Sequence, residues 1–105
     1  MRNKAINALL DMGMPAGLRG MHIIADVMEL FESDDVRNGK ITVLYALLAK
    51  RYNTSAASIE RNIRTAFNIL REHGYDDVVS CYLNFNSPTN SHLLHELYLR
   101  LTLEE

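Results

Sequence analysis

Residues 48–64 read LAKRYNTSAASIERNIR, and the prediction of the fold starts from them. Two helices that meet at a steep angle across a short turn need a small residue where their axes approach, and Ala49 meets that need. Asn53 suits the turn, because asparagine tolerates the left-handed backbone conformation better than other non-glycine residues. Ile59 follows Ala49 by ten residues, a position from which it can point back and lock the two helices together. The spacing predicts a helix-turn-helix.

Both helices of this motif extend beyond the quoted stretch. The first is predicted over about 42–52, with apolar contacts at helical spacing from Val43, Leu44, Leu47, Leu48 and Tyr52. The second begins after Thr54 or Ser55, either of which can accept a hydrogen bond from the unpaired amides of the first turn. It runs to about His73, where Gly74 ends it. Its buried stripe is Ile59, Ile63, Phe67 and Leu70.

The rest of the chain divides at Gly, Pro, Asn and Ser into helical lengths, with no hairpin signal between alternating runs. Further helices are predicted over 3–12, from about Pro15 to Ser33, over about 76–83, and after a turn at 87–91, with a loop at 37–39. The predicted fold is therefore all-α, with about six helices in a single domain. That domain spans residues 1–105 and contains the helix-turn-helix at about 42–73.

The composition is that of an ordinary globular domain. Hydrophobic residues make up 48% of the chain and charged residues 23%, too apolar for disorder and too interrupted by charge for a membrane span. Cys81 is the single cysteine and cannot form an intramolecular disulfide, and no apolar secretory stretch opens the chain, so a cytoplasmic location is expected. The net charge of −2 conceals an asymmetry, since residues 40–71 carry +5 and residues 72–105 carry −5. This asymmetry indicates an interaction face.

The basic segment places a polar face opposite the buried stripe of the second helix. Steps of three and four residues relate its members, Ser58, Arg61, Arg64, Thr65 and Asn68. Such a face can enter the major groove of double-stranded DNA, where arginine reads guanine and Glu60 could accept from the amino group of cytosine. Lys50, Arg51 and Arg71 are expected to meet phosphates. The pattern equally fits a solvated face on a packed helix, so the residues alone leave DNA reading open.

The chain resembles the C-terminal effector domain of stage zero sporulation protein A, a sporulation response regulator. Residues 13–16 with Arg19-Gly20 are similar to the family's G-V-P-A-x-x-K-G, and residues 41–45 to its I-T-K-V-L-Y with one residue missing. Residues 49–54 are similar to A-K-K-F-N-T, and residues 59–64 to V-E-R-A-I-R. Residues 88–91 repeat P-T-N-S, and residues 99–101 fall near L-R-L. The ordered set covers nearly the whole chain.

This resemblance implies a six-helix domain that binds a promoter box as tandem copies, with Glu60, Arg61 and Arg64 at the positions that the family uses on bases. The family also contacts the sigma subunit of RNA polymerase through the segment after the recognition helix. In this chain, residues 74–88 are shorter than in the family and are acidic at Asp76 and Asp77, which leaves the polymerase contact open. The phosphorylatable receiver domain that precedes the family's effector domain is not in this sequence.

Other signals point to no chemistry. His92 and His95 lack the further ligands that a metal site needs, so no metal and no cofactor is predicted. Cys81, Ser80 and His73 do not form a recognisable nucleophile and base, and a partly buried, inert cysteine is expected, so the chain is not predicted to be an enzyme. The alternative function is a protein-binding adaptor that has lost specific DNA binding, favoured by the acidic residues from Asp26 to Asp35.

Overall fold

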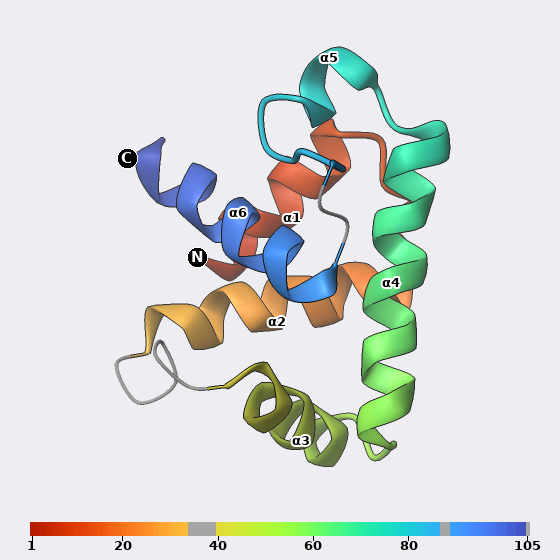
Figure 1. Cartoon of the computed structure of the whole chain (residues 1–105), viewed down its shortest axis with the longest axis vertical. Coiled ribbons are helices and arrows are strands. Elements are labelled where there is room, and N and C mark those ends of the chain that lie inside the picture. The colour runs from red at the N-terminus through yellow and green to blue at the C-terminus, as the bar shows by residue number, and fades with distance from the viewer. Residues whose placement is uncertain (34–39, 87–88, 105) are drawn as a thin grey trace.

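The computed structural model describes residues 1–33, 40–86 and 89–104, and within these ranges it is all-α, as predicted. The helices are α1 Arg2–Asp11, α2 Arg19–Glu32, α3 Ile41–Arg51, α4 Ala56–His73, α5 Asp76–Val79 and α6 Asn90–Leu103 (Figure 1). The prediction of about six helices is confirmed. The predicted loop at 37–39 and residues 87–88 of the predicted turn lie outside the described residues. No described helix has the length and apolar character needed to cross a bilayer.

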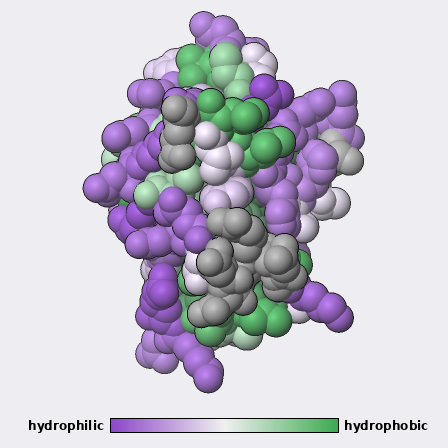
Figure 2. All heavy atoms as spheres, turned by 90° about the vertical axis from the view of Figure 1, so that its left-hand side faces the viewer, coloured by the Kyte–Doolittle hydropathy of each residue, from purple (hydrophilic) through white to green (hydrophobic). Residues whose placement is uncertain are grey.

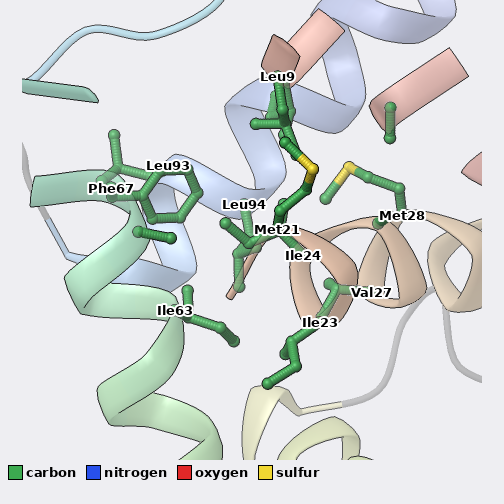
Figure 3. Packing of buried hydrophobic residues seen from close by; sticks show 14 of the residues in the cluster. Leu9, Met21, Ile23, Ile24, Val27, Met28, Ile63, Phe67, Leu93 and Leu94 are labelled. Atoms are coloured by element: carbon green, nitrogen blue, oxygen red, sulfur yellow. The ribbon is translucent and has the colours of Figure 1, made fainter. Parts of the chain in front are cut away.

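Helix α2 lies at the centre of the fold and packs against α1, α3, α4 and α6 (Figure 1). Its buried residues face several directions, because a helix covered on most sides needs apolar residues around most of its circumference. Side chains from the surrounding helices meet those of α2 in one core, as Figure 3 shows for Leu9, Met21, Phe67 and Leu94. Burial of this core is the main favourable contribution to folding, and it fixes α4 in place.

The start of α2 differs from the prediction. The sequence indicates a helix from about Pro15, but α2 begins at Arg19. Residues 15–18 form a turn instead, in which the Leu18 amide donates to the Pro15 carbonyl at 3.2 Å. Leu18 has an extended backbone, with ψ 124°, and serves as the N-cap. A proline can open a helix, but here Gly17 follows two residues later, and glycine is a poor helix former.

Gly74 ends α4 as predicted, but for a different reason. Its φ of −69° is open to any residue, so no left-handed cap is involved. A Cβ at this position would lie 2.5 Å from the Leu70 carbonyl oxygen and 3.0 Å from that of Met12, so glycine is required by close packing. Gly13 has the left-handed backbone expected of a helix stop, with φ +102°. The fifth helix is shorter than the predicted 76–83, since α5 covers only Asp76–Val79.

Some apolar residues assigned to helix faces point to solvent. On α3, Val43 is 50% exposed and Leu47 is 44% exposed, whereas Leu44 and Leu48 are buried. The prediction that all four contribute apolar contacts is wrong for the first two. α3 packs against α4 and α2, and Val43 and Leu47 lie on the part of α3 that these helices do not cover.

Candidate nucleic-acid interface

The turn between α3 and α4 is built by local hydrogen bonds. Asn53 has φ +52° and is the one non-glycine residue with positive φ in the described ranges. The Thr54 amide donates to the Ala49 carbonyl at 2.8 Å, and the Asn53 amide donates to the Lys50 carbonyl at 3.2 Å. These two bonds form the Schellman motif that closes a helix with a left-handed residue. The predicted role of Asn53 in the turn is confirmed.

Helix α4 starts immediately after this turn. Ser55, rather than Thr54, is the N-cap, and its side chain accepts a hydrogen bond from the Ser58 amide at 3.1 Å. Ile59 is fully buried, and Ala49 is 9% exposed where α3 packs on α4. α3 crosses the end of α4 that carries this turn (Figure 1). The predicted pair of helices around a short turn is therefore present.

The two faces of α4 differ sharply in exposure. Buried residues line the inner face, namely Ile59, Ile63, Ala66, Phe67 and Leu70. Of the predicted DNA-facing residues on the outer face, Arg61, Arg64, Thr65, Asn68 and Arg71 are exposed. Glu60 and Ser58 are half-buried at its two edges. The structure thus brings the predicted base-contacting residues together on one open face of a helix that is anchored from behind.

Glu60 and Arg64 form an ion pair one helical turn apart. Both side chains are about half exposed, 45% for Glu60 and 56% for Arg64. The backbone of Glu60 is fixed separately, because its carbonyl accepts from the Asn90 side chain of α6 at 3.0 Å. An exposed pair of this kind contributes about 0.3–0.5 kcal/mol, so it can separate at little cost. Arg61 makes no hydrogen bond or ion pair with any described residue.

The three cations predicted to meet phosphates have different surroundings. Lys50 is exposed on the last turn of α3. Arg51 is also exposed, but its guanidinium lies 4.0 Å from a carboxylate oxygen of Asp26. Arg71 stacks over the Phe85 ring, with its Cζ 5.0 Å from the ring centroid. Ten residues separate Arg71 from Arg61, about 15 Å along the axis of α4.

Asp26 lies in the interior of the protein, where the sequence interpretation does not place it. The adaptor alternative counts it among surface acids, but it is 5% exposed and is the buried charged residue of the described chain. Arg2 donates from Nε to Oδ1 at 2.8 Å, and the Tyr52 hydroxyl donates to Oδ2. The pKa of Tyr52 is raised to about 12, chiefly by burial and next by this hydrogen bond. The hydrogen bond with Asp26 also raises the pKa of Arg2.

This cluster of Arg2, Asp26 and Tyr52 ties three helices to the turn of the motif. Tyr52 is the C-cap of α3, so its bond to Asp26 holds the turn against α2, and Arg2 adds α1. A sequence signal did exist, because Asp26 interrupts the apolar run from Ile23 to Met28. An acid in such a run is expected to be buried with a partner, but its partners come from distant positions.

Cys81 is exposed, contrary to the expectation of a partly buried cysteine, and its thiol donates to the Asp77 carbonyl at 3.4 Å. His92 lies 3.2 Å from Glu96 across one turn of α6. The described ranges hold no group of three or more side chains arranged to bind a metal ion.

The geometry defines a helix-turn-helix domain whose second helix presents a basic outer face. The chain matches the family model described as Sporulation initiation factor Spo0A C terminal over residues 5–101, and it belongs to that family. The predicted resemblance is confirmed over nearly the whole chain. The family consists of DNA-binding regulatory domains, so DNA binding and transcription regulation in sporulation are the functional class of this chain.

Proposed function

We propose that this chain binds double-stranded promoter DNA sequence-specifically, with α4 as the recognition helix in the major groove. The observation that supports this most directly is the joint exposure of Arg61 and Arg64 on the outer face of α4, whose inner face is buried. A helix held from behind by a packed partner can insert its outer face into a groove without rearranging the core.

Arg61 and Arg64 are the proposed base-reading residues. Each guanidinium can donate two hydrogen bonds to O6 and N7 of guanine, a pairing worth about 1–3 kcal/mol against a wrong base. Glu60 has two proposed roles that follow from its ion pair with Arg64. It orients that guanidinium in the unbound protein, and it accepts from a cytosine amino group once the pair separates.

Further polar residues, on the outer face of α4 and at the end of α3, are proposed to contact the DNA backbone. They are Lys50, Arg51, Ser58, Thr65, Asn68 and Arg71. Lys50 is the most available of the cations among them, because Arg51 and Arg71 already lie against Asp26 and Phe85. Phosphate contacts of this kind fix the register of the protein on the duplex and make the affinity depend on salt.

The partners follow from the same proposal. A few cations on one monomer give modest affinity, so two copies bound to tandem boxes are expected, and the second contact with DNA is strengthened by the first. The sigma subunit of RNA polymerase is a further candidate partner, through the segment after α4. The domain is proposed to act in the cytoplasm, as a regulator and not as an enzyme.

Selection of binding sites from a random duplex library, followed by mobility shift, tests the proposal. We expect the chain to enrich a defined box, and Arg61→Ala and Arg64→Ala each to weaken binding to that box by about 5- to 150-fold, or 1–3 kcal/mol. Arg100→Ala is the matched control, because Arg100 is an exposed arginine on α6. Wild-type affinity of both α4 variants for the selected box would contradict the assignment.

The adaptor alternative is favoured by one observation on α6. Leu99 is 55% exposed and Leu103 is 71% exposed, and they line a shallow groove of about 430 Å³ along that helix. On the face of the molecule where α6 ends, apolar side chains show between polar ones (Figure 2). The alternative has lost part of its basis, however, because Asp26 is buried and cannot repel DNA. Failure of the folded chain to enrich any duplex would favour the adaptor.

A further inference from the structure

We propose that Arg19, the first residue of α2 and a residue outside the helix-turn-helix, binds a DNA phosphate beside the recognition helix. This inference rests on the proposed insertion of α4 into the major groove. Arg19 is not among the residues that the sequence pattern of the motif singles out, and only the packing of α2 on α4 brings it to the interface.

The start of α2 touches α4 directly at Gly20. A Cβ on Gly20 would lie 2.4 Å from the carbonyl oxygen of Asn62 and 2.8 Å from the Cβ of Ala66. The Asn62 side chain in turn donates to the Ser58 carbonyl at 2.8 Å. Arg19, which precedes Gly20 at the start of α2, therefore lies beside the edge of α4 that carries Ser58 and Asn62.

The side chain of Arg19 is held at the turn of the motif. Its Nη2 donates to the Tyr52 carbonyl at 3.2 Å, and its Cζ lies 5.5 Å from the centroid of the Tyr52 ring. The ring is itself fixed, because the Tyr52 hydroxyl donates to buried Asp26. An arginine that is already oriented loses less conformational freedom when it binds.

The charge of Arg19 is not neutralised within the described chain. Arg2, Arg51 and Arg64 each lie within 4.0 Å of a carboxylate oxygen. Arg19 is exposed and pairs with no carboxylate among residues 1–33, 40–86 and 89–104. Its remaining guanidinium donors are therefore available to an anion that approaches the turn.

The arrangement of cations on α4 explains why a phosphate would be the anion. A helix in the major groove has a phosphate backbone on each side. With 100° per residue, Arg64 and Arg71 lie on one side of Arg61, whereas the other side carries Ser58, Asn62 and Thr65 and no cation. Arg19 approaches from that second side and supplies the positive charge that α4 lacks there.

Salt-dependent binding of charge-matched variants tests this role. Fluorescence anisotropy would measure affinity for the selected duplex and for a random duplex of about 20 base pairs, a length that holds one binding site. The proteins compared are wild type, Arg19→Gln, Arg19→Lys and the control Arg100→Gln. Loss of one phosphate contact should reduce the slope of log K against log[salt] by about 0.9 in magnitude, so that a fourfold rise in salt weakens Arg19→Gln roughly threefold less than wild type. The slope should be unchanged for Arg100→Gln and nearly unchanged for Arg19→Lys, which keeps the charge.

The outcomes separate the inference from the proposed function. If wild type binds and Arg19→Gln keeps the wild-type slope on both duplexes, Arg19 makes no phosphate contact. If Arg100→Gln lowers the slope equally, the effect is one of net charge and the inference is also wrong. If Arg19→Lys loses as much slope as Arg19→Gln, the residue acts through the fold of the turn. If wild type binds neither duplex, the proposed DNA binding itself fails.

Discussion

Substitution of Tyr52 by phenylalanine removes the hydroxyl that donates to buried Asp26 and leaves the ring in place. Asp26 is 5% exposed, so water cannot replace the lost donor freely, and the Arg51 guanidinium at 4.0 Å is too far to form a hydrogen bond. Hydrogen bonds to charged groups contribute about 1.5–3 kcal/mol. We therefore expect Tyr52→Phe to lower the free energy of unfolding by about 2 kcal/mol at pH 7. For a domain of this size, that corresponds to a fall in Tm of about 10 °C.

The same contact predicts how the difference in the free energy of unfolding between wild type and Tyr52→Phe changes with pH. Burial and the bond to Asp26 raise the pKa of Tyr52 to about 12, above its ordinary value of 10.0. Because the folded-state pKa is raised, the stabilisation is fully present below pH 10 and is lost as the pH rises toward 12. At pH 11 the loss is at most about 1.4 kcal/mol, and about 1 kcal/mol once the partial exposure of the side chain is allowed for. Phenylalanine does not titrate, so the gap between the two proteins should narrow by that amount.

Urea unfolding followed by far-UV circular dichroism at pH 7 and pH 11 measures the stability difference between the two proteins and its change with pH. The pKa of Tyr82 is also raised, to about 12, by its hydrogen bond to Glu104, but Tyr82 is present in both proteins and its effect cancels. Tyr75→Phe is the control, because the Tyr75 ring is 61% exposed and its hydroxyl bonds to no described residue. A gap below about 0.5 kcal/mol at pH 7, or a gap that does not narrow at pH 11, would refute the pairing of Tyr52 with Asp26.

Two further substitutions test the local geometry around α4. Asn53→Ala should destabilise the domain by about 1 kcal/mol, because alanine is strained at the φ of +52° that Asn53 adopts. Asn53→Gly should have a free energy of unfolding within about 0.3 kcal/mol of wild type. Equal stability of the two variants in chemical denaturation would contradict a left-handed turn. Gly20→Ala should destabilise by about 1–3 kcal/mol, because the new Cβ would meet the Asn62 carbonyl at 2.4 Å, and a thermal melt that matches wild type would contradict this close approach.

The Asp26 contacts also affect how α4 is oriented relative to the rest of the domain. Tyr52 precedes the left-handed residue of the turn, so the hydrogen bond to Asp26 fixes the point from which α4 departs. Two arginines hold this Tyr52–Asp26 pair: Arg19 donates to the Tyr52 carbonyl, and Arg2 donates to the Asp26 carboxylate. The orientation of the basic face is therefore set in part by residues that precede the helix-turn-helix in the chain.

Local spacing in the sequence is enough to predict the helix-turn-helix and the outer face of its second helix. Asn53 at the turn, an N-cap at Thr54 or Ser55 and the buried stripe of α4 act within a few residues of one another, and such short-range effects can be read from spacing. The choice of Ser55 over Thr54 comes from the structure. Membership of the sporulation family can likewise be predicted from the ordered local motifs, and the family match confirms it. The late start of α2 and the solvent exposure of Val43 escaped prediction, because they depend on which neighbours cover a helix.

The positions of charges that are distant in sequence depend on how the helices pack. Asp26 contacts Arg2 across 24 positions and Tyr52 across 26, and Arg19 reaches Tyr52 across 33. Periodicity places each side chain on a face of its own helix, but the partner of that face depends on how the helices pack. Such packing is set by the core that α1, α2, α3, α4 and α6 share, and the spacing of residues within one helix does not determine it.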